Sequence, residues 1–245
     1  MFPGFPPEAL TFFRSLARNN RREWFQPRKE IFDTQVKEPM IRLVESINTE
    51  LVRFAPDYAM EPKKALYRIY RDTRFSADKT PYKTHIAAIF PRRGLSRTAG
   101  AGFYIGISHK EVEVACGSYM PGPEELRAIR TWLAENHGEF RKVERRVAKL
   151  MGPMAGSSLQ RVPKGFDAAH PAADLIKRKQ WFFYVTLDPK LATSPKLYPE
   201  IVKRFRAIAP VVEMLNAPLV TQRAAAAKAS LFQSHVVFAN DREME

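Results

Sequence analysis

Residues 103–120, FYIGISHKEVEVACGSYM, decide the fold that the sequence predicts. The runs FYIGIS and EVEVACGSYM are two strand candidates, and His109 and Lys110 between them suit the two-residue turn of a β-hairpin. Cys116 falls inside the second strand, where a cysteine packs as a small apolar residue. We therefore expect an antiparallel hairpin at the centre of the chain.

Further strands and helices extend outward from this hairpin. The strand candidates are ALYRIYR at 65–71, which alternates between two faces, THIAAIFP at 84–91 and WFFYVTLDP at 181–189. Helical patterns occupy residues 6–20, 22–35, 38–54, 122–136, 140–151, 172–179 and 198–219. Pro210 is expected to interrupt the last of these helices.

This order of elements predicts the fold class. Helices come first, a mainly antiparallel sheet follows, and helices return at the end, which favours a single α+β domain over residues 1–245. The sheet should be central and flanked by the N-terminal and C-terminal helices. The alanine-biased tail at 221–245 is expected to be either helical or frayed.

The composition bounds the class of protein. The chain has 245 residues and is 45% hydrophobic, enough for a buried core, while its apolar runs are shorter than the roughly 18 residues that span a membrane. The first residues, MFPGFPPEAL, lack the basic region of a signal peptide. The lone Cys116 fits a reducing compartment and excludes a multi-thiolate zinc site. We therefore expect a cytoplasmic protein that has no contact with membranes.

The positive charge is large and uneven. The formal net charge is +14, and residues 63–97 hold ten Lys or Arg residues but only two Asp residues. Residues 136–180 are also basic, whereas 101–135 carry more acids than bases. Two separated basic segments indicate an anionic partner, such as a phosphorylated small molecule or a nucleic acid. Solvated charged faces would give the same counts.

The densest polar segment is RDTRFSADKTPYKT at 71–84, between two strand candidates. Loops held between strands often carry binding groups, and arginine can grip a carboxylate or phosphate with two hydrogen bonds. We expect Phe75 to anchor this loop in the core. The ligand-binding candidates here are Arg71, Asp72, Arg74, Ser76, Asp78, Lys79, Tyr82 and Lys83.

A structural explanation of the same segment stays open. The loop charges would then satisfy one another, with Arg71–Asp72 and Asp78–Lys79 as surface ion pairs worth about 0–1 kcal/mol each. In that case the segment stabilises the fold and binds no ligand.

A second candidate stretch is RVPKGFDAAHP at 161–171. It adds Lys164, Asp167 and His170 to the binding candidates, and Asp167 is placed to orient the imidazole of His170. His170 could equally cap the helix that follows. If the two stretches line one cleft, Asp78 and His170 are the candidates for proton transfer.

Three stretches of this chain resemble one known family. They are FFRSLARNNRREWF at 12–25, the polar segment at 71–84 and RVPKGFDAAHP. Together they are similar to the domain of unknown function 2461, an uncharacterised bacterial and fungal family with the signature RDTRFSxDKxPYKT. The resemblance implies no activity, but it implies that these stretches belong together. The matching residues are Asn19, Asn20, Trp24, Arg71–Lys83, Gly165, Asp167 and His170.

Other known site patterns are absent from the sequence. It contains no phosphate-binding GxxxxGK[ST] or GxGxxG motif and no HExxH metal motif. No metal site is therefore expected, and no particular cofactor is indicated.

Three functions stay open at this point. The first is binding of an anionic ligand in a basic pocket, with or without phosphate or ester chemistry. The second is nucleic-acid binding by the basic segment FRKVERRVAKL at 140–150 together with Arg92, Arg93 and Arg97. The third is a non-catalytic adaptor whose polar segment is structural.

Overall fold

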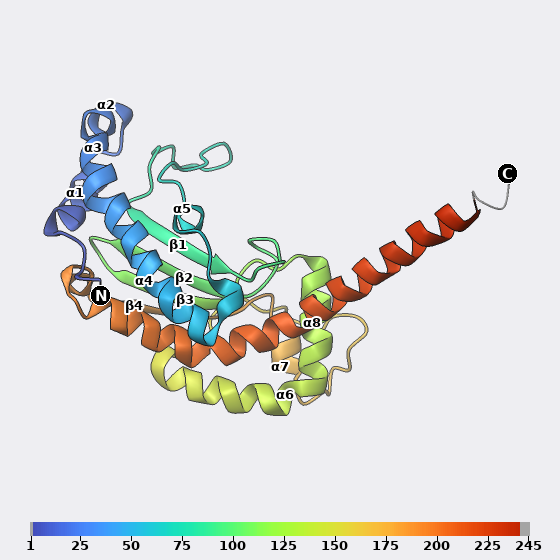
Figure 1. Ribbon diagram of the computed structural model, residues 1–245. Coiled ribbons are helices and arrows are strands. Elements are labelled where there is room, and N and C mark those ends of the chain that lie inside the picture. Colours follow the sequence, from blue (N-terminus) through green and yellow to red (C-terminus); the bar gives the residue numbers. More distant parts are fainter. Residues whose placement is uncertain (1, 241–245) are drawn as a thin grey trace.

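A four-stranded antiparallel sheet forms the centre of the protein (Figure 1). The computed structural model describes residues 2–240, with the side chains of residues 2–224. The strands are β1 (His85–Pro91), β2 (Gly102–Ser108), β3 (Val112–Ser118) and β4 (Trp181–Leu187), paired in the order β1-β2-β3-β4. The predicted hairpin at 103–120 is confirmed as β2 and β3, and the Ser108 N–H donates to the Glu111 carbonyl to close its turn.

Helices precede, interrupt and follow the sheet. Before β1 lie α1 (Pro7–Arg18), α2 (Arg22–Phe25), η1 (Gln26–Arg28), α3 (Lys29–Phe32), η2 (Asp33–Lys37), α4 (Glu38–Phe54), η3 (Pro56–Tyr58) and α5 (Pro62–Ala65). Between β3 and β4 lie α6 (Pro123–Met151) and α7 (Ala173–Ile176), and after β4 lie η4 (Pro189–Thr193) and α8 (Leu197–Asn240). The expected α+β class, with helices from both ends of the chain around an antiparallel sheet, is confirmed.

The two faces of the sheet differ in composition. Strand residues alternate in direction, and one face is almost fully buried and, apart from Ser118, apolar: Ile86, Ala88, Phe90, Phe103, Ile105, Ile107, Val112, Val114, Cys116, Trp181 and Phe183. We call this the covered face. The opposite, second face carries Tyr104, Gly106, Glu113, Ala115 and Tyr184.

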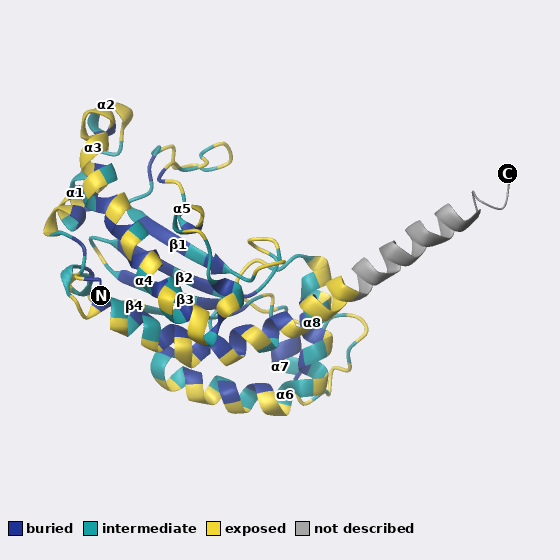
Figure 2. Ribbon diagram, viewed as in Figure 1, coloured by how far each residue is buried: buried dark blue, intermediate teal, exposed yellow. Residues whose placement is uncertain are grey.

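The long helices α4 and α8 pack on the covered face, where they cross the sheet (Figure 1). Phe205 of α8 lies with its ring centroid 4.8 Å from that of Phe103 and 5.7 Å from that of Phe90. Figure 2 shows the strands and the inner sides of these helices as buried, with exposed residues on the outer helix sides. This segregation is the amphipathic pattern that drives helix-on-sheet packing.

Several predicted elements differ from the structure. Residues 65–71 form no strand, because their pairing with neighbouring residues is limited to the isolated bridges Leu66–Ala88 and Tyr70–Tyr82 and a few backbone hydrogen bonds, without a continuous ladder. The two helices predicted at 122–136 and 140–151 are one helix, α6. The helix predicted at 172–179 is confined to Ala173–Ile176.

The predicted interruption at Pro210 is wrong. Helix α8 continues through Pro210 and also through Pro218, so each proline only removes one backbone donor from the helix. Asn216, which lies between them, is fully buried and bonds the Tyr58 hydroxyl at 2.8 Å and both the N–H and the carbonyl of Ala101. These contacts hold this part of α8 against the start of β2. Of the predicted tail at 221–245, the last five residues lie outside the described part of the chain.

Candidate functional site

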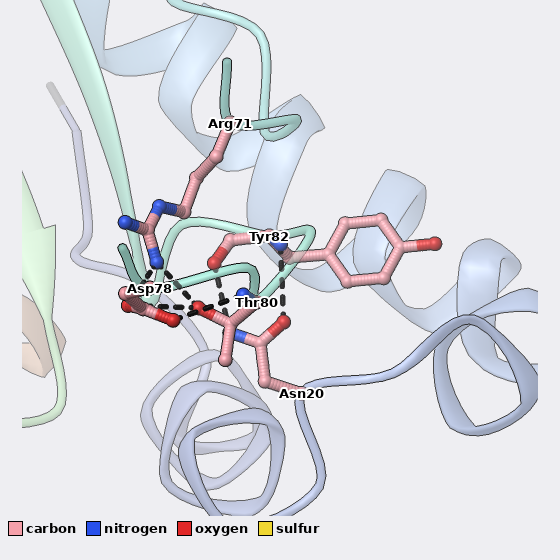
Figure 3. A network of polar contacts seen from close by, with 5 residues as sticks. All are labelled: Asn20, Arg71, Asp78, Thr80 and Tyr82. Atoms are coloured by element: carbon pink, nitrogen blue, oxygen red, sulfur yellow. Dashed lines mark hydrogen bonds and ion pairs between the residues drawn. The ribbon is translucent and has the colours of Figure 1, made fainter. Parts of the chain in front are cut away.

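The polar segment at 71–84 is a loop that is closed at its base. The Arg71 N–H donates to the Pro81 carbonyl at 2.9 Å, and the Lys83 N–H donates to the Ile69 carbonyl at 2.8 Å. Asn20 then ties this base to the N-terminal helices (Figure 3). Its side-chain amide donates to the Tyr82 carbonyl at 2.8 Å, and its side-chain carbonyl accepts from the Tyr82 N–H at 3.0 Å.

The ring of Tyr82 fixes the loop from the apolar side. It is buried and stacks on Phe25, with ring centroids 4.1 Å apart. Phe25 belongs to the apolar core around α1 and α3, and Trp24 is partly buried and packs against it. Phe75, in contrast, was expected to anchor the loop and does not, because its side chain is 96% exposed. Tyr82 supplies the anchor instead.

The charged groups of the loop bond one another. Arg71 bonds Asp78 and Thr80, as Figure 3 shows. Arg74 grips Asp72 with two nitrogens, at 3.0 and 2.8 Å. The bonded guanidinium in each pair is the main cause that lowers the pKa of Asp72 and of Asp78 to about 2.

These pairs bear on the structural explanation of the polar segment, in which the loop charges satisfy one another. The loop charges do satisfy one another, but the pairs are Arg71–Asp78 and Arg74–Asp72 rather than the sequence neighbours that were expected. Lys79 donates to the Thr73 carbonyl at 2.9 Å, and Ser76 donates its backbone N–H to the same carbonyl. Most polar groups of the loop are therefore engaged in holding the shape of the loop.

The second predicted stretch lies elsewhere. Residues 161–171 run beside α6 and α7, whereas the loop at 71–84 lies near α1 to α3 at the other end of the molecule (Figure 1). The structure therefore does not bring the two stretches into one cleft. The matching family residues are separated in the same way, since Asn20 and Tyr82 meet each other but not His170.

Local contacts explain the residues of this second stretch. The His170 ring accepts the Ala172 N–H at 3.0 Å, which is the capping alternative for this histidine. Asp167 does not orient that ring; its carboxylate accepts the Ala169 N–H at 2.9 Å. Lys164 is exposed. Gly165 has a φ of +94°, a backbone conformation that favours glycine and explains why the stretch carries one there.

A cavity of about 540 Å³ opens on the second face of the sheet. Small strand residues form part of its floor, and aromatic side chains line most of its wall. The lining includes Tyr67, Arg97, Gly102, Tyr104, Glu113, Ala115, Tyr119, Met120, Phe182 and Tyr184. A cavity of this size, with many aromatic groups and few polar ones, has the usual properties of a small-molecule site.

Glu113 is the carboxylate on the cavity floor. Its two oxygens accept hydrogen bonds from the hydroxyls of Tyr104, at 3.2 Å, and Tyr184, at 3.0 Å. Burial is the main cause that raises the pKa of both tyrosines, and the Glu113 charge adds to it; the pKa of Tyr184 rises to about 12. Both phenols therefore stay protonated and act as donors at neutral pH.

A glycine makes this arrangement possible. Gly106 pairs with Glu113 across β2 and β3, and a Cβ atom at Gly106 would lie 2.4 Å from a Glu113 carboxylate oxygen. The Glu113 side chain therefore lies across β2 in space that only glycine leaves free.

Two cations lie against Tyr67, a residue that lines the cavity, and one of them, Arg97, lines the cavity as well. Lys83 Nζ lies 5.0 Å from the ring centroid of Tyr67, and Arg97 Cζ lies 4.4 Å from the same centroid. The ring of Tyr67 is 6.3 Å from that of Tyr104, centroid to centroid. Tyr67 therefore connects the cations to the tyrosine and carboxylate cluster on the floor.

These cations repel each other. Burial is the largest cause that lowers the pKa of Lys83, and the charges of Arg68 and Arg97 lower it further. Within residues 2–224, neither Lys83 nor Arg97 forms a salt bridge with a carboxylate. Arg97 bonds only the Ala65 carbonyl, at 3.0 Å. The pair is thus a concentration of positive charge that no described side chain neutralises.

Sequence reasoning placed only one member of this site, Lys83, among the candidates for an anionic ligand. It named Arg97 for nucleic-acid binding instead, and it missed Tyr67, Tyr104, Glu113 and Tyr184. For the residues in strands a signal existed, since Tyr104, Glu113 and Tyr184 are the polar members of alternating strands, on the face opposite the apolar one. Only the register of three strands shows that they meet.

The described part of the chain offers neither a cluster of metal ligands nor a membrane-spanning helix. No group of three or more His, Cys, Asp or Glu side chains is placed to hold a metal ion there. No described helix is both long and apolar enough to span a bilayer.

Comparison with known proteins places the chain in a family. The profile of the family described as "Conserved hypothetical protein (DUF2461)" matches residues 8–214. This range includes α1 from its second residue, the polar loop and all four strands. It ends within α8, of which it includes residues 197–214. No curated protein matches the sequence. Because the match covers most of its length, this chain belongs to the DUF2461 family of conserved hypothetical proteins.

Proposed function

We propose that this protein binds a small anionic ligand in the cavity on the second face of the sheet. The observation that carries the proposal is the pair Lys83 and Arg97, which lie against one tyrosine ring at the cavity and have no carboxylate partner among the described side chains. A phosphate or carboxylate between them would relieve their mutual repulsion. Arginine and lysine are the usual residues for such groups.

The polar loop has an indirect part in this proposal. Asn20 fixes the backbone of Tyr82, and Lys83 follows directly, with its N–H bonded to Ile69. The loop therefore positions Lys83, the motif residue that lies against the ring of Tyr67 at the cavity. Its remaining candidates, Arg71, Asp72, Arg74 and Asp78, hold the loop and are proposed as positioning residues.

The predicted proton-transfer groups are not included. Asp78 is bonded to Arg71 and Thr80, and its lowered pKa makes it a weak base. His170 lies on another part of the molecule, where one of its ring nitrogens accepts the Ala172 N–H. The proposal is therefore one of binding, and it assigns no reaction.

A thermal-shift screen with matched variants tests the proposal. The probes are inorganic phosphate, p-methylbenzoate, phosphorylated sugars and nucleotides. A probe at about 100 times its dissociation constant adds about 2.7 kcal/mol to the stability of the folded state, and the melting temperature rises accordingly. We expect this rise to be lost in the double variant Lys83→Gln/Arg97→Gln.

The control removes two positive charges elsewhere. Lys196→Gln/Arg93→Gln changes the net charge equally, at exposed positions outside the polar loop that do not line the cavity. It should retain the full shift. An equal loss in both double variants would show that only the net charge matters, and would contradict a site at Lys83 and Arg97.

The nucleic-acid alternative has less support. Arg92, one of its three loop arginines, is bonded to Asp57 at 2.7 Å and to Glu213 at 2.6 Å, and Arg141 of the basic helix is bonded to Asp174 at 2.6 Å. Both arginines are thus partly neutralised. A cytoplasmic location remains part of the proposal and rests on the lone Cys116, which is buried in β3.

A further inference from the structure

Glu113 is an unusual group on the floor of the cavity. Its carboxylate has no salt bridge to any cationic side chain of residues 2–224, although the chain carries an excess of positive charge. It is held instead by two neutral phenols, from Tyr104 and Tyr184. The same cavity therefore has an unpaired negative group on its floor and unpaired positive groups beside Tyr67.

The hydrogen-bonding capacity of Glu113 is not exhausted. A carboxylate offers about four acceptor sites over its two oxygens, and each oxygen here accepts one phenol. At least one site on each oxygen therefore remains for a donor from a ligand. The two phenols hold the carboxylate in a fixed orientation, so little freedom is lost when a donor binds.

The surrounding rings favour a donor that carries positive charge. Tyr67, Tyr104, Tyr119, Phe182 and Tyr184 line the cavity, and the face of an aromatic ring attracts an ammonium group. Tyr119 and Phe182 pack edge to face, with centroids 5.1 Å apart, and so form a continuous wall. An amine next to Glu113 would thus meet both a carboxylate and aromatic rings.

We infer that the ligand is zwitterionic. This inference rests on the proposed function: the ligand carries the anionic group proposed above, and it also carries an amine that binds Glu113. The two charges must be separated, because the cations lie against Tyr67 whereas Glu113 is bonded to Tyr104, and the centroids of these two rings are 6.3 Å apart. A flat ring or short chain between an amine and an acid keeps the two charges apart and suits the aromatic walls. The ligand class is therefore a small amino acid or amino phosphate with separated charges.

Three probes built on one ring separate the two charge contacts. p-(Aminomethyl)benzoate carries both groups, p-methylbenzoate carries only the acid, and benzylamine carries only the amine. Their dissociation constants are measured by calorimetry on the full-length protein. We expect p-(aminomethyl)benzoate to bind at least about tenfold more tightly than p-methylbenzoate, which corresponds to about 1.4 kcal/mol.

Glu113→Gln tests the origin of that preference. The amide keeps the size of the side chain but removes its charge, so the ratio of the two dissociation constants should fall to about one. Glu45→Gln is the matched control, because it removes the same charge from an exposed position on α4. This helix packs on the covered face of the sheet, away from the cavity. It should leave the ratio unchanged. If Glu113→Gln does not fold, Glu113→Ala replaces it, since it removes the same charge, and it must also reduce the ratio.

The outcomes separate this inference from the proposed function. Equal affinities for p-(aminomethyl)benzoate and p-methylbenzoate in the unmodified protein would overturn the zwitterion, and so would a preference that survives in Glu113→Gln. The anion site itself would still stand if p-methylbenzoate binding depended on Lys83 and Arg97. If none of the anionic probes bound, the proposed function and the inference would both be wrong.

Discussion

Asn20 is the residue on which the position of the polar loop most depends. Its side chain makes two hydrogen bonds to the backbone of Tyr82, across 62 positions of sequence. Replacing it by alanine leaves the Tyr82 N–H and carbonyl without these partners, and the expected loss of stability is about 1–3 kcal/mol. Urea denaturation followed by circular dichroism measures this change.

Asn19→Ala is the control for this experiment. The Asn19 side chain bonds only the Ser15 carbonyl, four residues earlier in the same helix. Its loss should cost less than the loss of Asn20. Equal effects of the two substitutions would mean that Asn20 does not hold the loop.

The two loop arginines are expected to differ in importance. Arg74 is 77% exposed, and exposed ion pairs are worth about 0–1 kcal/mol, so Arg74→Ala should hardly change the free energy of unfolding. Arg71 is only 26% exposed and bonds both Asp78 and Thr80, so Arg71→Ala should be more destabilising. Chemical denaturation of both variants checks the order, and a larger effect of Arg74→Ala would contradict it.

The polar loop, as an element, should respond to acid. The guanidinium groups of Arg71 and Arg74 lower the pKa of Asp78 and Asp72 from 3.8 to about 2 in the folded protein. A lowered pKa stabilises the folded state above the ordinary value of the carboxyl group, and this contribution is lost as the pH falls from about 4 to about 2. The loop should therefore loosen over that range.

The amide of Thr80 reports this transition, because its N–H donates to Asp78 at 2.9 Å. Its proton chemical shift should titrate with a pKa of about 2, while that of the buried Val114 in β3 stays constant until the protein unfolds. In Asp78→Asn the shift of Thr80 should not titrate. A midpoint near 3.8 in the unmodified protein would show that the carboxylate is not bonded as described.

Two glycines test the helix and sheet elements. Gly138 lies inside α6 with nothing within 4 Å of an added Cβ, so Gly138→Ala should stabilise the protein by about 0.4–1 kcal/mol.

Gly117 in β3 has a φ of +127°, and an added Cβ would lie 2.3 Å from the Trp181 carbonyl oxygen. Gly117→Ala should therefore destabilise it, and the melting temperatures of both variants give the signs.

Elements with a strong local pattern could be predicted from the sequence, and others could not. The hairpin at 103–120 and the strand predicted at 181–189, which forms β4 at Trp181–Leu187, were confirmed, because the local sequence pattern defines them. Residues 65–71 alternate too, yet backbone contacts with 81–88 fix them as an irregular segment. Pro210 was misread because packing of α8 on the sheet outweighs the loss of one helix hydrogen bond.

At the scale of the whole molecule, the candidate site joins parts that are distant in sequence. Tyr67 precedes the polar loop, Lys83 lies at its C-terminal end, Arg97 follows β1, Glu113 lies in β3 and Tyr184 lies in β4. Polar density in the sequence pointed to the whole segment 71–84, but the charges of Arg71, Asp72, Arg74 and Asp78 within it bond one another. Charge that is locally satisfied and charge that is left unpaired look the same in a sequence, because only the fold decides which carboxylate each cation meets.

The most direct test of the central claim is an NMR titration with p-methylbenzoate. Amide signals of the protein are followed as the probe is added, and the affected residues identify the binding site. We expect the largest changes at Lys83, Arg97 and Tyr104, around the cavity on the second face of the sheet. Changes confined to residues 72–79 would place the anion in the polar loop and would contradict the account.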